Sequence, residues 1–252
     1  MNRMSVFALV GAVSLLVTST AQAIPEDGYA HGYETLVQPW ADAGVVSSFS
    51  GTRGVSISYV AFEEPGASDA IVILNGRTEN YLKYLEVAYD LRGLGASVFM
   101  MDHRGQGSSG RMLSDRQKGY VKHFDNYVKD VKKLVEGVVR PAGYSRIFVL
   151  GHSLGGCIAT RFAEKHADLI DGLILSAPML QINTSPYPES IAYSAAQVLT
   201  WFWQGESYAP GKGPYYTETF EEQSLTQSEA RYAMAEAKLE ANPALRLGGP
   251  TN

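Results

Sequence analysis

Cysteine is nearly absent from this sequence, which has only Cys157 among its 252 residues. An internal disulfide is therefore impossible, and no group of histidines and cysteines has the spacing of a metal site. Basic residues number 21 against 26 acidic ones, and a net charge of -5 gives no electrostatic support for binding nucleic acid. Repeats and low-complexity segments are also missing. With 45% hydrophobic and 19% charged residues, the composition is that of an ordinary globular protein.

The first 23 residues have the order of a signal peptide. Arg3 gives a positive start, an apolar run covers Val6–Val17, and Ala21-Gln22-Ala23 has the small residues of a cleavage site. The apolar run is shorter than the roughly 20 residues that a membrane-spanning helix needs. We therefore expect cleavage after Ala23 and export of the mature chain, which would be periplasmic or secreted. An uncleaved N-terminal anchor is the alternative.

Strand and helix patterns alternate between residues 24 and 177, which we take as the core domain. The segment Val55–Val60 alternates in polarity, as a half-buried antiparallel strand does. Later strands are predicted at Ala70–Leu74, Ser97–Met101, Arg146–Leu150 and Gly172–Ser176, of which Ala70–Leu74 and Arg146–Leu150 are expected to be buried. Apolar periodicity predicts helices at Tyr81–Leu91, Phe124–Val138 and Leu154–Lys165. This order favours an α/β fold, a mostly parallel sheet with helices on both faces.

Residues 178–252 are rich in aromatic side chains and lack the strand pattern. Two helices are predicted there. One covers about Ile191–Trp203, and the other runs from a capping box at Thr226 and Glu229 to Asn242. A helical, aromatic insertion after a strand is typical of a lid over an active site. Such a lid suits an apolar ligand and also peripheral contact with a membrane surface.

The strongest motif is the pentapeptide Gly151-His152-Ser153-Leu154-Gly155. It follows a buried strand and opens a helix, which is the setting of a nucleophile elbow in α/β-hydrolases. A tight, strained turn exposes the Ser153 hydroxyl, and the glycines leave room for the neighbouring backbone. The Leu154 N–H is then placed to stabilise an oxyanion. The alternative is a helix that happens to start after a Gly-Ser pair.

A second oxyanion donor is expected in the loop after an earlier strand. The sequence Leu74-Asn75-Gly76-Arg77 occupies that place, and the backbone N–H of Arg77 is the best candidate. Two positions for the Arg77 side chain remain open: facing the ligand, or solvated on the loop.

The remaining histidines and the single cysteine are predicted to be structural. In Asp102-His103, the aspartate is expected to fix the backbone of a tight loop. The ring of His152 should point away from its neighbour Ser153. We expect His166 to cap the helix after the elbow and Cys157 to be a small packing residue. The surface histidines are His31 and His123.

Three segments together resemble bacterial lysophospholipases of the monoacylglycerol-lipase-like group. They are Ile73–Tyr81, Met101–Ser108 and Gly151–Gly156, and the closing stretch Asn242–Thr251 is similar too. The resemblance implies an α/β-hydrolase that cleaves a single acyl ester of a glycerol-based lipid without a cofactor. Many members of the wider group have His-Gly where this chain has Asn75-Gly76.

In the family, the triad acid and histidine lie on strands that follow the lid, and neither is in these 252 residues. We therefore expect a C-terminally truncated α/β-hydrolase whose last strands are missing and which is inactive as written. The lipid substrate would be a small molecule. A non-catalytic lipid-binding remnant, or another chemistry on the same fold, is the alternative. Acyl-chain length, head group, hydrolase versus transacylase activity and oligomeric state are not encoded in these motifs.

Overall fold

The computed structural model describes residues 23–181, 188, 190–191, 194 and 205–251. Most of the predicted helix Ile191–Trp203 and all of the predicted signal peptide except Ala23 lie outside these described residues.

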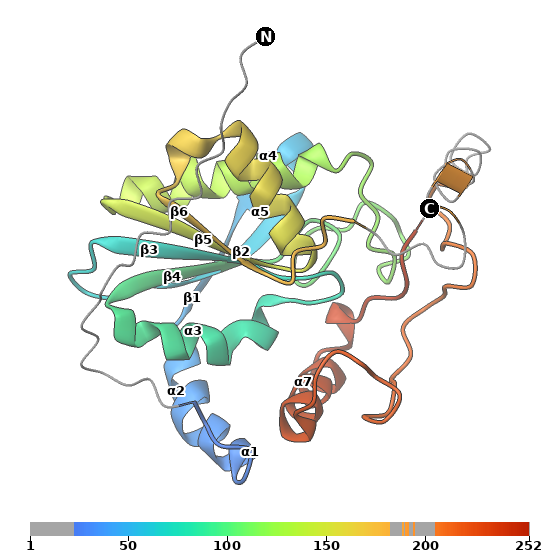
Figure 1. The fold of residues 1–252 in the computed structure, drawn as a ribbon, viewed down its shortest axis with the longest axis horizontal. Coiled ribbons are helices and arrows are strands. Elements are labelled where there is room, and N and C mark those ends of the chain that lie inside the picture. Colours follow the sequence, from blue (N-terminus) through green and yellow to red (C-terminus); the bar gives the residue numbers. More distant parts are fainter. Residues whose placement is uncertain (1–22, 182–187, 189, 192–193, 195–204, 252) are drawn as a thin grey trace.

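A six-stranded sheet forms the centre of the molecule (Figure 1). Its strands follow the order β1-β2-β4-β3-β5-β6 across the sheet. The strands are β1 (Val45–Ser50), β2 (Ser56–Phe62), β3 (Asp69–Leu74), β4 (Ala96–Met101), β5 (Arg146–His152) and β6 (Gly172–Ser176). The last four run parallel to one another, while β1 and β2 pair antiparallel. The predicted mostly parallel sheet is confirmed; β1 is an additional strand that the sequence pattern did not indicate.

Helices cover both faces of this sheet, as predicted (Figure 1). One face carries α4 (Asp125–Leu134), which continues through a π-helical turn to Val139, and α5 (Leu154–Lys165). The other carries α1 (Tyr29–Gly32), α2 (Gln38–Ala41) and α3 (Leu85–Leu91). A 3-10 turn at Tyr81–Tyr84 precedes α3. The helix after β3 therefore begins at its predicted residue, although its first turn is not α-helical.

Strand β3 contributes to the core on both faces because successive strand residues point to opposite sides. Val72 and Leu74 pack with α4 and α5, whereas Ile71 and Ile73 pack with the N-terminal helices and α3. All four are at least 95% buried. The continuous apolar run in the sequence thus reflects a strand that is covered by helices on both faces of the sheet.

The long helix in the described part of residues 178–252 is α7 (Glu229–Ala241). Its N-cap is Ser228, whose hydroxyl accepts a hydrogen bond from Arg231 N at 3.1 Å. The predicted capping box at Thr226 is therefore wrong: Glu229 is the first helical residue, and Thr226 Oγ1 instead accepts from Ser228 N. The predicted end of the helix at Asn242, before a proline, is confirmed.

The chain just after the predicted cleavage site holds α7 in place. Arg231 donates to the carbonyl oxygen of Ile24 at 2.9 Å and to Glu86 at 2.7 Å. Glu26 accepts from the Ser228 hydroxyl and from Arg231. The Ile24 side chain is itself buried. Residue 24 thus belongs to a segment that is tied to α7.

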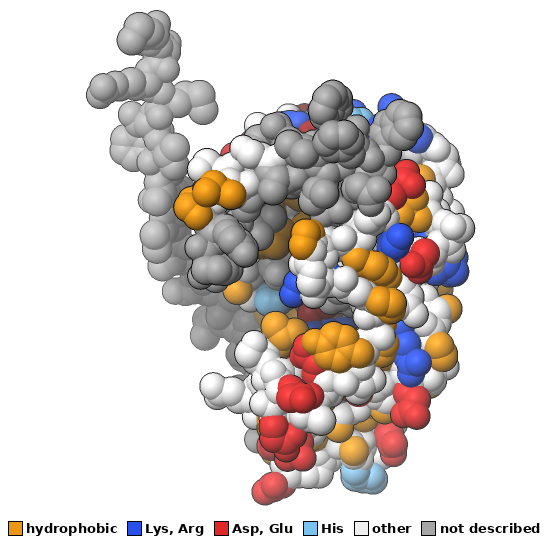
Figure 2. All heavy atoms as spheres, turned by 90° about the vertical axis from the view of Figure 1, so that its right-hand side faces the viewer, with side chains coloured by type: hydrophobic (Ala, Val, Ile, Leu, Met, Phe, Trp, Pro, Cys, Tyr) orange, Lys and Arg blue, Asp and Glu red, His pale blue; other side chains and the backbone are white. Residues whose placement is uncertain are grey.

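The surface over the carboxyl ends of the strands is mixed in character (Figure 2). Apolar side chains stand singly or in small groups among polar ones, and acidic side chains gather at the lower end of this face. In the part of the chain that the structure describes, no helix combines the length and the apolar character needed to cross a membrane.

Candidate active site

Ser153 occupies a strained turn between β5 and α5. Its backbone has φ 51° and ψ -116°, a conformation that non-glycine residues rarely adopt. Such a conformation costs about 1–3 kcal/mol and persists only where neighbours enforce it. Here Ser153 N donates to Ser176 O at 3.1 Å, and Met179 N donates to Ser153 O at 2.9 Å. The turn is therefore anchored to the end of β6 and to the segment that follows it.

Three glycines allow this turn to pack against β3. A β-carbon at Gly155 would lie 2.0 Å from the carbonyl oxygen of Leu74, and one at Gly151 would lie 2.6 Å from Gly155 O. At Gly156 it would meet Pro178 at 2.8 Å. Real β-carbons do not approach atoms so closely, so each position needs glycine. The spacing of the motif follows from these contacts.

The loop after β3 lies directly against Ser153. A β-carbon at Gly76 would be 3.3 Å from Cβ of Ser153. The Gly76 N–H is already used, because it donates to Glu79 Oε2 at 2.7 Å. By contrast, the N–H groups of Arg77 and Leu154 donate to no acceptor within the described residues. Leu154 is the first residue of α5, where a backbone N–H has no partner inside the helix. Among the described residues, these two N–H groups are thus unpaired donors near the serine.

Glu79 organises this loop, and sequence reasoning did not single it out. Its carboxylate accepts from Gly76 N, from Tyr84 OH at 2.5 Å and from Lys83 Nζ at 2.5 Å. Burial alone would raise the pKa of Glu79, but Lys83 and the hydrogen bonds outweigh it and hold this pKa below its usual value. Glu79 is therefore an ionised support for the loop. The only sequence signal was its position three residues after Gly76.

Asp102 fixes the neighbouring loop, as predicted. It is fully buried and accepts from Ser108 N at 2.7 Å, Tyr81 N at 2.8 Å and Asn75 Nδ2 at 3.3 Å. Burial raises the pKa of Asp102 to about 6, although these hydrogen bonds oppose the shift. Its role is to join the loops after β3 and β4. It is enclosed by backbone and is not presented to a substrate.

His103 is also fully buried, and burial lowers its pKa to about 4. In its neutral form, Nε2 donates to Asn75 O at 3.1 Å, while Nδ1 has no hydrogen-bond partner within the described residues. Gln106 completes the arrangement by donating to Gly76 O at 2.7 Å. Asn75 is the centre of this buried polar network.

The other histidines lie outside this polar network. His152 Nδ1 is 3.4 Å from Ser176 Oγ, and its ring centroid is 6.4 Å from that of Tyr84, so the direction of its ring relative to Ser153 stays a prediction. His166 is the C-cap of α5, where its backbone N–H donates to Phe162 O. The exposed histidines are His31 and His123.

Cys157 is half-buried, and burial raises the pKa of its thiol. A thiol with a raised pKa carries little thiolate at neutral pH and is a poor nucleophile. This agrees with its prediction as a packing residue.

The Arg77 side chain is not a solvated loop arginine. It is half-buried, and Nη2 lies 3.5 Å from the carbonyl oxygen of Gly248 in the closing stretch of the chain. Burial lowers the pKa of its guanidinium. The side chain thus lies against the closing stretch of the chain.

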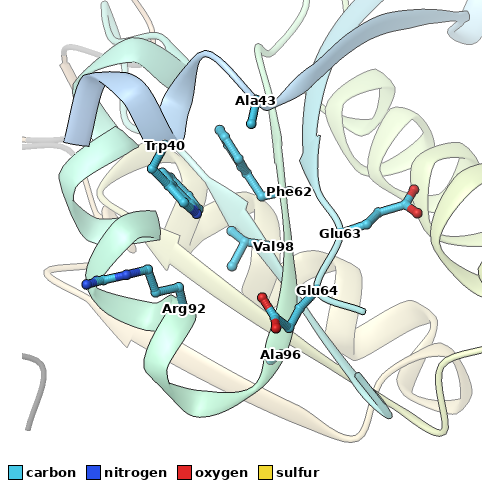
Figure 3. A pocket seen from close by; sticks show the side chains of 8 residues that line it. All are labelled: Trp40, Ala43, Phe62, Glu63, Glu64, Arg92, Ala96 and Val98. Carbon is cyan, nitrogen blue, oxygen red and sulfur yellow. The ribbon is translucent and has the colours of Figure 1, made fainter. Parts of the chain in front are cut away.

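A separate hollow lies far from Ser153, at the amino end of β4 (Figure 3). Trp40 and Phe62 stack there with ring centroids 4.0 Å apart, and Arg92 and Glu64 also line the hollow. The strained serine and the free N–H donors are at the opposite, carboxyl end of the sheet. The hollow is therefore not part of the candidate active site.

Known proteins with similar sequences and folds are hydrolases. A family model described as "Serine aminopeptidase, S33" matches residues 66–252. Lysophospholipase L2 of Escherichia coli (strain K12) is 36% identical over 211 residues, which are 81% of this chain and 60% of that protein. Monoglyceride lipase of Mus musculus is 32% identical over 120 residues, covering 48% of this chain and 37% of that one.

Among solved structures, a thermostable carboxyl esterase from Bacillus coagulans in complex with glycerol superposes with a TM-score of 0.62. It is 19% identical in sequence, and the match covers 83% of this chain and 69% of the esterase. At that identity the likeness speaks for the fold alone, and the fold is that of the α/β-hydrolases.

Proposed function

The chain belongs to the α/β-hydrolase family described as serine aminopeptidase, S33, and on that premise we propose that it is a serine carboxylic-ester hydrolase acting on lysophospholipids or monoacylglycerols. The observation that carries the proposal is the backbone of Ser153, at φ 51° and ψ -116° between a buried strand and a helix. The free N–H groups of Arg77 and Leu154 beside it support the same reading. Strained backbone and unpaired donors gather where a transition state is to be stabilised.

In the proposed reaction, the Ser153 oxygen attacks the ester carbonyl while its proton passes to a base. The carbonyl oxygen becomes an oxyanion that accepts from the N–H groups of Arg77 and Leu154. The ester bond breaks, the lysolipid's glycerol moiety leaves with a proton, and an acyl-serine remains. Water then attacks the acyl-serine through the same oxyanion site and releases the fatty acid.

The base for this reaction does not come from residues 154–252. In this fold the triad follows the order serine, acid, histidine, and the only histidine after Ser153 is His166. It caps the far end of α5, roughly 20 Å from Ser153 at 1.5 Å per residue. Asp171 is bound to Ile147 N at the amino end of β5, the wrong end of the sheet. In that triad order, residues 154–252 supply no histidine within reach of Ser153.

The substrate class rests on relatives rather than on geometry. The names of the similar proteins are lysophospholipase and monoglyceride lipase, and both kinds of lipid carry a single acyl ester on glycerol. The chain spans 60% of the length of lysophospholipase L2, so the activity of the whole protein is part of the proposal. The test is hydrolysis of matched lipids that differ in having one or two acyl chains. Turnover of diacyl phospholipids equal to that of single-chain lipids would count against it.

A non-catalytic lipid-binding protein is the second candidate, and the missing base within residues 154–252 favours it. The two candidates differ in one observable. An enzyme releases fatty acid in a manner that depends on Ser153, whereas a binding protein retains the intact lipid.

We also propose export, on the sequence features of residues 1–23. The attachment of Ile24 to Arg231 agrees with a mature chain that begins at residue 24.

A further inference from the structure

Arg77 begins beside the proposed nucleophile. Its neighbour Gly76 is in contact with the Ser153 side chain, and its own N–H is the proposed oxyanion donor. The carbonyl oxygen of an ester bound for attack therefore accepts from the Arg77 N–H, and the guanidinium belongs to the same residue. Whatever lies a few bonds from that ester is near Arg77.

Among the described residues, the Arg77 guanidinium has no acidic partner. It is half-buried, yet it forms no ion pair with any carboxylate in that part of the chain. Its one hydrogen bond to a described residue goes to Gly248 O at 3.5 Å, the limit of hydrogen-bond length. Burial lowers the pKa of this group, and Tyr127 opposes the shift.

Arg104 is the contrasting case, a buried arginine that is paired with a carboxylate inside the protein. Arg104 is 98% buried and is matched by Asp130, with Nε to Oδ2 at 2.6 Å and Nη2 to Oδ1 at 2.8 Å. Withdrawing a cation from water without such a partner is unfavourable. The environment of Arg77 is therefore suited to an anion that arrives with the ligand.

We propose that Arg77 binds the phosphate of a lysophospholipid and so selects phosphate-bearing single-chain lipids over neutral monoacylglycerols. This inference rests on the proposed function and names its substrate class. In a lysophospholipid only the glycerol carbons and their ester oxygens separate the phosphate from the scissile carbonyl. A carbonyl held by the Arg77 N–H thus has its phosphate within reach of the same residue's side chain.

The planar guanidinium suits this ligand because it can donate two parallel hydrogen bonds to one phosphate. Lysine would keep the charge and lose the paired donors. A charge-assisted hydrogen bond of about 1.5–3 kcal/mol corresponds to about tenfold or more in affinity.

The test measures binding by calorimetry, with the protein expressed from its own gene and carrying Ser153→Ala so that neither lipid is consumed. The probes are octanoyl lysophosphatidylethanolamine and mono-octanoylglycerol below their micellar concentrations. The parent is expected to bind the lysophospholipid more tightly. Adding Arg77→Gln should weaken binding of the lysophospholipid at least about tenfold. Its effect on binding of the monoacylglycerol should be much smaller. The affinity of Arg77→Lys for the lysophospholipid should lie between those of the parent and Arg77→Gln.

Arg92→Gln is the matched control, because Arg92 is also half-buried but lies at the other end of the sheet (Figure 3). It should leave both affinities unchanged. Added sn-glycerol 3-phosphate should displace the lysophospholipid if the phosphate is what Arg77 recognises and the acyl chain only adds affinity. Melting temperatures of all variants verify that each is folded.

Two results would overturn the proposal: a parent with no preference for the phosphate-bearing lipid, or equal weakening of both lipids by Arg77→Gln. Turnover is measured separately with Ser153 intact. If the parent hydrolyses neither lipid, the proposed function fails, while the ratio of the two affinities still decides the role of Arg77.

Discussion

Gly155 packs so tightly against β3 that a β-carbon at position 155 would lie 2.0 Å from the carbonyl oxygen of Leu74 and 2.5 Å from its carbonyl carbon. Both atoms belong to backbone and cannot rotate aside. This contact joins the first turn of α5 to the end of β3, and so it sets the distance between Ser153 and the loop that carries Arg77.

Gly155→Ala is therefore expected to lower the free energy of unfolding by about 3 kcal/mol, at the upper end of the range for overpacked sites. Chemical denaturation of the variant and the parent measures this. Gly137→Ala is the control, since a β-carbon at Gly137 meets no atom within 4 Å. It lies in the helical segment that continues α4, so alanine should keep or raise stability by up to about 1 kcal/mol. Similar destabilisation by both changes would contradict the packing argument.

Asp102 and His103 are adjacent and fully buried, and burial shifts their pKa values in opposite directions. Burial raises the pKa of Asp102 from 3.8 to about 6, so this residue stabilises the fold most below pH 3.8, and its contribution is lost as pH rises to about 6. Burial lowers the pKa of His103 from 6.5 to about 4, so its contribution is complete above pH 6.5 and is lost as pH falls to about 4. In the parent the two dependences oppose each other.

Single substitutions of Asp102 and His103 should separate the two pH dependences. Between about pH 4 and pH 6, the free energy of unfolding of Asp102→Asn should rise with pH relative to the parent, by up to about 1.4 kcal/mol per pH unit. That of His103→Gln should fall with pH by a similar amount. Urea unfolding across this range gives both slopes. Slopes of the same sign in the two variants would show that these groups do not titrate as described.

Local patterns in the sequence were sufficient for much of the fold. Strand β6 was predictable from its apolar run, although its residues are only half-buried or exposed. Strands β2 to β5 and helices α4 and α5 were predictable because each has at least one buried apolar face. Strand β1 (Val45–Ser50) was not, because it is a largely exposed edge strand that contains three serines and shows no such face.

The candidate active site likewise has parts that were predictable from the sequence and parts that were not. The elbow was readable because Gly151, Ser153 and Gly155 are contiguous and follow a strand. Glu79 and Gln106 were missed, and the Arg104–Asp130 pair was missed too, because their partners are joined only by the fold. Asp130 lies 26 residues from Arg104 in the sequence, and no periodicity connects positions that far apart.

Export gives a further prediction. The mature protein should begin at Ile24, because the A-x-A site ends at Ala23 and Ile24 is the first residue held by Arg231. N-terminal sequencing of protein recovered from the periplasm or medium measures this. A mature pool that retains Met1 would support the alternative of an uncleaved anchor.

A polypeptide of residues 24–252 should bind single-chain lipids without appreciable turnover. It holds Ser153 and both oxyanion donors, but His166 is its only histidine after the serine and lies roughly 20 Å away. Release of fatty acid is the measurement, with Ser153→Ala of the same polypeptide as the control. Efficient hydrolysis that disappears in the control would reveal a base among these residues.

The most direct test of the account is to locate the nucleophile. The protein expressed from its own gene is treated with a fluorophosphonate, and the modified peptide is identified by mass spectrometry, alongside lysophospholipid hydrolysis by parent and Ser153→Ala. We predict a single adduct, on Ser153, in the parent and no adduct in the variant. The rate of hydrolysis by the variant should fall to what binding and the oxyanion donors supply, roughly 10³–10⁴ over water in the serine-triad template. An adduct on another residue, or hydrolysis that persists at the parental rate in Ser153→Ala, would contradict the central claim.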